Sequence, residues 1–134
     1  MARATYLLDS GLLIRHLRGR PEAVRIMREL GKREHLSIAS VSRLEIHAGM
    51  HEHERYHTQK LLSRFITFPM DSDVAERAGD YIREFHSRGV TLAVPDAIIA
   101  ATALVHGLTL VTFNPKDFPM SGLNLFPTSS TKNE

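Results

Sequence analysis

The sequence contains no cysteine among its 134 residues. This absence excludes disulfide bonds and thiolate metal sites, and it is compatible with a reducing compartment. The opening segment, MARATYLLDS, has neither a long apolar core nor a small-residue cleavage site, so we expect no signal peptide. No apolar run approaches the roughly 20 residues of a membrane-spanning helix. We therefore expect a cytoplasmic protein with no membrane partner.

A strong excess of charge is also absent, because 17 basic residues nearly balance 15 acidic ones and the net charge is +2. This balance neither indicates nor excludes a nucleic-acid binder, since the local distribution of charge matters more than its sum. The sequence is 43% hydrophobic, which is enough for one core. It shows no internal repeat and no linker rich in proline, glycine or serine. We assign residues 1–127 to one domain and residues 128–134 to a polar C-terminal tail.

Apolar runs alternate with segments of helical spacing along the whole chain. The runs predict strands at 5–8, 35–40, 65–68 and 108–112, with a possible short edge strand at 123–126. The helical spacing predicts helices over about 21–30, 41–50, 52–65, 71–86 and 95–106. This alternation favours an α/β fold with a central parallel sheet and helices on both faces.

Carboxylates occur where such a fold binds its ligands, at the carboxyl ends of the strands. Asp9 directly follows the first predicted strand, and Asp117 lies shortly after the fourth. Each has a purely structural alternative, because Asp9 is a good helix cap and Asp117 suits a turn after Asn114-Pro115.

Two further carboxylates lie near the predicted helix starts. Glu45 is spaced to pair with Ser42 in a capping box, unless Ser40 is the true cap, in which case Glu45 needs another role. Asp96 follows Pro95 at a helix start, where the helix dipole favours a negative charge. Asp9, Glu45, Asp96 and Asp117 gathered in one cleft would repel one another, and a hard divalent cation would relieve that repulsion. Such a pocket predicts one or two metal ions that activate water for phosphodiester hydrolysis.

Three stretches resemble the PIN domain family, and specifically its VapC-type toxin ribonucleases. They are YLLDSGLLI around Asp9, SIASVSRLEIHAG around Glu45, and VPDAIIAATALVHGLTLVTFNPKDF around Asp96 and Asp117. The resemblance implies a three-layer α/β/α sandwich and an endoribonuclease that depends on Mg²⁺ or Mn²⁺. It also implies an RNA substrate, a homodimer, and inhibition by a VapB-type antitoxin. The three residues Ser10, Thr112 and Asn114 would be auxiliary polar groups near the metal.

Two positions depart from the family pattern. The family often has Asn two residues after the first acid, where this chain has Gly11, and Arg before the later Asn, where it has Phe113. Neither departure removes a metal-ligand candidate. Both leave open an alternative, a catalytically weak RNA- or protein-binding module on the same fold.

Two other patterns have functional alternatives. The stretch HERYH, from His53 to His57, matches the H-E-x-x-H pattern, which on one helix would bind zinc with Glu54 as general base. Neighbouring histidines make a chance match easier, so the alternative is a solvated polar helix. A basic cluster follows the first acid and could hold RNA phosphates or be an ordinary charged surface; its members are Arg15, Arg18 and Arg20.

Overall fold

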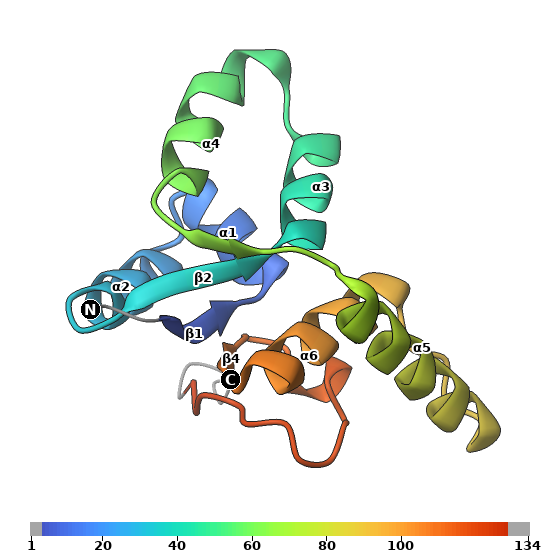
Figure 1. Ribbon diagram of the computed structural model, residues 1–134. Coiled ribbons are helices and arrows are strands. Elements are labelled where there is room, and N and C mark those ends of the chain that lie inside the picture. The colour runs from blue at the N-terminus through green and yellow to red at the C-terminus, as the bar shows by residue number, and fades with distance from the viewer. Residues whose placement is uncertain (1–3, 129–134) are drawn as a thin grey trace.

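The computed structural model of the protein describes residues 4–128 and contains one four-stranded parallel sheet (Figure 1). The strand order is β3-β2-β1-β4. The strands are β1 (Ala4–Leu8), β2 (His35–Ala39), β3 (Ile66–Phe68) and β4 (Thr109–Val111). The helices are α1 (Ser10–Leu17), α2 (Pro21–Gly31), α3 (Ser40–Gly49), α4 (Arg55–Leu62), α5 (Ser72–Ser87) and α6 (Val94–His106). Two short 3₁₀ turns are η1 (Glu52–Glu54) and η2 (Pro115–Asp117).

The sheet separates two hydrophobic cores, one on each face. Successive strand residues point to opposite faces, so Leu7 joins the core under α5 and α6 while Leu8 joins the core under α1, α2 and α4. In β4, Leu110 and Val111 divide in the same way. Both faces of the sheet are therefore covered by helices, and the predicted three-layer sandwich is confirmed.

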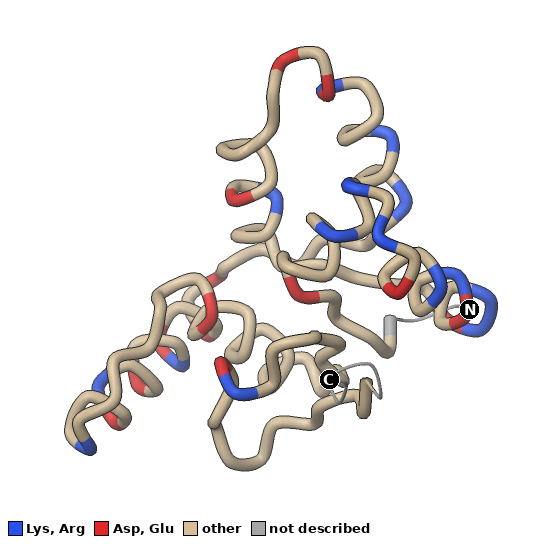
Figure 2. Tube along the Cα trace, turned by 180° about the vertical axis from the view of Figure 1, so that it is seen from behind, with Lys and Arg blue, Asp and Glu red and all other residues tan. Residues whose placement is uncertain are grey.

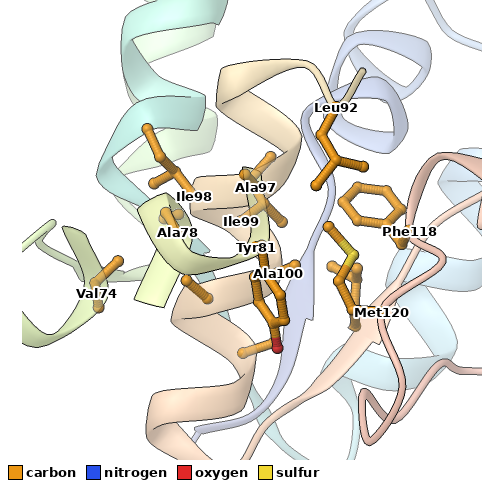
Figure 3. Packing of buried hydrophobic residues seen from close by; sticks show 14 of the residues in the cluster. Val74, Ala78, Tyr81, Leu92, Ala97, Ile98, Ile99, Ala100, Phe118 and Met120 are labelled. Atoms are coloured by element: carbon orange, nitrogen blue, oxygen red, sulfur yellow. The ribbon is translucent and has the colours of Figure 1, made fainter. Parts of the chain in front are cut away.

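Helices α5 and α6 pack against each other through both large and small side chains (Figure 3). Val74, Ala78 and Tyr81 repeat on one face of α5, and α6 contributes isoleucines and alanines, with Ile98 beside Ala78. Asp71 caps α5 by accepting a hydrogen bond from the Val74 amide at 3.0 Å. Gly107, with φ of 66°, ends α6 in the left-handed conformation that favours glycine.

The structure differs from the predicted elements in three places. Helix α1 was not predicted, because SGLLIRHL is short and contains a glycine, and burial of Leu12 and Leu13 is what stabilises it. The possible edge strand at 123–126 is wrong, since only an isolated bridge joins Leu125 to Leu110. The polar helix expected over 52–65 divides into η1 and α4.

Thr128 is buried, and its hydroxyl donates to the Thr112 carbonyl at 3.1 Å. The remainder of the predicted tail, 129–134, lies outside the described residues.

Among the helices in the described range, none combines the length and apolar character that a bilayer crossing requires.

Candidate functional site

The carboxyl ends of β1 and β4 meet at Asp9. Its amide donates to the Val111 carbonyl at 3.0 Å, which continues the pairing of the two strands by one residue. The Thr112 hydroxyl donates to Asp9 Oδ2 at 2.7 Å, and the Asn114 amide donates to that hydroxyl at 2.9 Å. Because the Thr112 oxygen accepts from Asn114, its single proton is committed to Asp9. Asp9 is 6% exposed, so these hydrogen bonds hold a buried carboxylate in place.

Asp9 does not cap helix α1 with its side chain. It occupies the N-cap position, but its carboxylate makes no capping hydrogen bond. Burial raises the pKa of Asp9, and the charge of Glu45 raises it further, while the Thr112 hydroxyl and the amides of Ser10 and Gly11 act against that rise. The Thr112 hydroxyl and the first amides of α1 therefore offset only part of the cost of burying this carboxylate.

Glu45 faces the same region from the second turn of α3. The helix begins at Ser40 after the N-cap Ala39, so the predicted capping box between Ser42 and Glu45 is absent. Instead the Ser10 hydroxyl donates to Glu45 Oε1 at 2.7 Å, and the hydroxyl oxygens of Ser10 and Ser42 are 2.8 Å apart. Ser10 thus links the start of α1 to the acid on α3.

The last two acids complete a shared electrostatic region. Asp96 lies half-buried in the first turn of α6, and Asp117 is exposed in η2. The pKa of Asp96 is raised to about 6, first by burial and then by the charges of Asp9, Asp117 and Glu45. The other three carboxylates predicted from the sequence therefore all act on Asp96, although the four come from separate segments.

The four carboxylates have no basic partner. Within residues 4–128, none of them lies within 4.0 Å of a lysine, arginine or histidine nitrogen. In the same range, no three Asp, Glu or His side chains are placed so that they could together hold a metal ion. An all-oxygen donor set suits a hard cation, and Mg²⁺ commonly uses one or two carboxylates and takes its other ligands from water and substrate. By donor type alone, the four acids suit such an open site.

The two departures from the family pattern have distinct structural settings. A Cβ at Gly11 would lie 3.6 Å from Asp9 Oδ2 and 3.8 Å from Asn114 Nδ2, which is ordinary van der Waals contact with the site. Phe113 is buried in the core, and the Arg15 guanidinium lies 4.8 Å from its ring centroid. The cation–π contact places Arg15 beside the segment that carries Thr112 and Asn114.

The H-E-x-x-H stretch has a structural role at the start of η1. Glu54 accepts a hydrogen bond from the His51 amide at 2.7 Å and so caps η1. His53 and His57 belong to different elements, η1 and α4, and both are exposed. This geometry argues against a zinc peptidase and supports the alternative of a solvated polar segment.

Comparison with known proteins gives concordant results. The family model for the PIN domain matches residues 6–119. Ribonuclease VapC10 of Mycobacterium tuberculosis is 39% identical over 114 residues, covering 85% of this chain and 86% of the relative. Ribonuclease VapC19 of the same species is 31% identical over 115 residues, covering 85% and 92%.

Solved structures agree with the sequence relatives. A toxin–antitoxin complex from Klebsiella pneumoniae matches with a TM-score of 0.74 and 31% identity, covering 92% of this chain and 98% of the other. A DNA-bound VapBC structure from Salmonella typhimurium, at 23% identity, matches over the same shares of both chains with a TM-score of 0.80, which supports the fold alone.

Proposed function

Because this chain belongs to the PIN domain family, we propose that it is a metal-dependent endoribonuclease and the toxin of a toxin–antitoxin pair. The observation that carries this proposal is the placement of Asp9, Asp117 and Glu45 near enough to Asp96 for their charges to add to burial in raising its pKa. Acids that repel one another without a basic partner are suited to a cation. The relatives named as VapC ribonucleases support RNA as the substrate.

In this proposal Asp9, Glu45, Asp96 and Asp117 hold one or two Mg²⁺ or Mn²⁺ ions. When bound, the metal would supply activation of water and stabilisation of charge on the phosphodiester. Thr112 positions Asp9, and the Asn114 amide fixes the direction in which the Thr112 hydroxyl donates. Ser10 positions Glu45. The protein then needs no side-chain nucleophile.

The test is cleavage of a labelled single-stranded RNA by the purified full-length chain. We expect cleavage with Mg²⁺ or Mn²⁺ and its loss in excess EDTA, with recovery when the metal is restored. Cleavage that continues unchanged in EDTA would contradict the metal role. Binding of RNA without cleavage under every metal condition would instead favour the alternative, a binding module on the same fold, for which Gly11 beside Asp9 is the relevant feature.

The antitoxin proposal rests on a pocket that reaches Glu45. This pocket of about 410 Å³ lies among α1, α3 and α4, and its lining includes Leu17, Ile46 and Glu45. A segment seated along this apolar wall would end beside an acid, where a basic side chain would be favoured. The similar Klebsiella structure is a toxin–antitoxin complex, which supports a partner of this class.

We expect the product of a small neighbouring gene to co-purify with the chain and to inhibit it. Met50→Glu places a charge in the pocket lining and should weaken this complex at least about tenfold, since about 1.4 kcal/mol of lost contact suffices. Met70→Glu is the matched control, because Met70 is 50% exposed and outside the pocket. Calorimetric titration measures both variants. Full RNA cleavage at saturating concentrations of that gene product would overturn the proposal.

Two further expectations stay predictions. The homodimer is supported by exposed apolar side chains, including Leu44 at 66% and Val94 at 56%, which a second copy could cover. Analytical ultracentrifugation tests the homodimer, and a monomer at micromolar concentration would contradict it.

The cytoplasmic location stays a prediction from the sequence, and a periplasmic fraction containing the protein would contradict it.

A further inference from the structure

A second pocket, of about 740 Å³, has none of the four acids in its lining. It is bordered by α2, the start of β2 and the segment after α4, with His35 and Leu36 at the amino end of β2. The four acids instead follow the carboxyl ends of the strands. Helix α1 connects the two regions, because Ser10 contacts Glu45 and His16 lines the pocket. His16 lies six positions after Ser10, about 9 Å along the helix axis.

The rim of this pocket is basic and largely unpaired. Arg28, Lys32, Arg33 and Arg64 are all exposed there, and Lys32 alone has an ion pair, with Glu29 at 3.5 Å. Across the described residues, no carboxylate lies within 4.0 Å of the other three cations. Figure 2 shows the blue lysine and arginine positions gathered on the side of the molecule that carries α2 and α4. The nearly balanced charge of the chain is thus unevenly distributed.

The single acid of the lining is already engaged. Glu34 Oε1 accepts a hydrogen bond from the Thr5 hydroxyl at 2.8 Å. Burial lowers the pKa of His16, and the charge of Arg64 lowers it further, so His16 is neutral at neutral pH. The positive charge of the pocket therefore comes from the exposed guanidinium and ammonium groups, which stay available to an anion.

The floor of the pocket is apolar. Met27, Leu36 and Leu61 are buried, and Phe65 is half-buried beside them. Guanidinium groups bind phosphate oxygens through paired hydrogen bonds, and aromatic rings accept stacked bases. A cationic rim above an apolar and aromatic floor therefore suits a nucleotide unit better than an acidic peptide, which would leave the floor without a matching group.

We propose that this pocket binds a nucleotide unit of single-stranded RNA outside the scissile linkage, so that one substrate strand engages both ends of α1. The inference rests on the proposed ribonuclease function, because RNA is the substrate assigned there. The pocket acts by binding alone and takes no part in bond cleavage. It adds affinity for strands long enough to reach it.

The test is fluorescence anisotropy of a labelled single-stranded RNA of about 20 nucleotides, with EDTA present so that binding is measured without cleavage. Arg28→Glu combined with Arg64→Glu should weaken binding at least about tenfold and reduce its salt dependence, because two phosphate contacts become repulsive. The matched control is Arg25→Glu combined with Arg83→Glu. Both control residues lie outside the pocket, Arg25 is on the same helix as Arg28, and the charge change is identical. The control should change binding less than about threefold.

Equal losses in the two double variants would overturn the inference, because net charge alone would then explain binding. Intact RNA binding in the pocket variant, with loss of the protein partner instead, would also overturn it and assign the pocket to an acidic protein segment. The proposed function is tested separately. If RNA binding depends on the pocket but the protein never cleaves RNA, the pocket inference is supported and the nuclease function is refuted. If the protein cleaves RNA but binding does not depend on the pocket, the nuclease function is supported and the pocket inference is refuted. Thermal unfolding of each variant verifies that it is folded.

Discussion

Asp9→Asn is expected to reduce RNA cleavage at least about 100-fold while leaving the metal-free protein as stable as the wild type or more stable. The asparagine keeps a carbonyl oxygen that can accept the Thr112 hydroxyl, so the hydrogen bond at 2.7 Å is preserved. It removes the charge of a buried carboxyl group whose pKa is already raised by burial. Single-turnover cleavage and urea unfolding in EDTA measure the two effects on the same preparation.

Asp71→Ala is the control with the opposite expected outcome. Asp71 caps α5 through the Val74 amide and lies outside the acidic site. Its loss should lower the free energy of unfolding by about 1 kcal/mol, as for other N-caps, and leave the cleavage rate unchanged. If Asp9→Asn destabilised the fold as Asp71→Ala does and still cleaved RNA at the wild-type rate, Asp9 would be a structural residue and the proposed site would be wrong.

The fold was predictable because its signals are local. Leu7 and Leu8 lie in a short apolar run, which indicates a strand. Val74, Ala78 and Tyr81 repeat at helical spacing, so residues close together in the sequence are enough to predict each element. Helix α1 lacks such a signal. It is stabilised by packing of Leu12 and Leu13, which the residues of the helix do not reveal alone.

The contacts within the site were less predictable than its acids. The position of Asp9 after a strand pointed to the functional edge, because ligands bind where parallel strands end. Its partner Thr112 is 103 residues away, and Ser10 and Glu45 are 35 residues apart. The sequence also favoured a capping box for Glu45. In the structure α3 begins at Ser40, and Glu45 instead accepts a hydrogen bond from the Ser10 hydroxyl. The basic pocket was missed for the same reason, since Arg28 and Arg64 come from separate segments.

A second large effect is expected from Asp96 when the pH changes in the absence of metal. Its pKa is about 6 in the folded protein against 3.8 for an ordinary aspartate, so the folded state holds its proton more tightly than the unfolded state. The stabilisation is complete below about pH 4 and is lost as the pH rises through about 6. A shift of two pKa units corresponds to about 3 kcal/mol, and solvent screening of this half-buried group reduces it to about 1–2 kcal/mol.

The matched comparison is Asp96→Asn, because asparagine has no proton to lose. We expect the wild type to lose about 1–2 kcal/mol of unfolding free energy relative to the variant between about pH 4 and 7, measured by urea unfolding in EDTA. Mg²⁺ at neutral pH should restore more stability to the wild type than to the variant, since an ion that binds the folded state offsets the repulsion among the carboxylates. A wild-type-to-variant difference that stayed constant over this pH range would mean that neither burial nor the charges of Asp9, Asp117 and Glu45 raise the pKa of Asp96. The electrostatic basis for a cation at this edge of the sheet would then be lost.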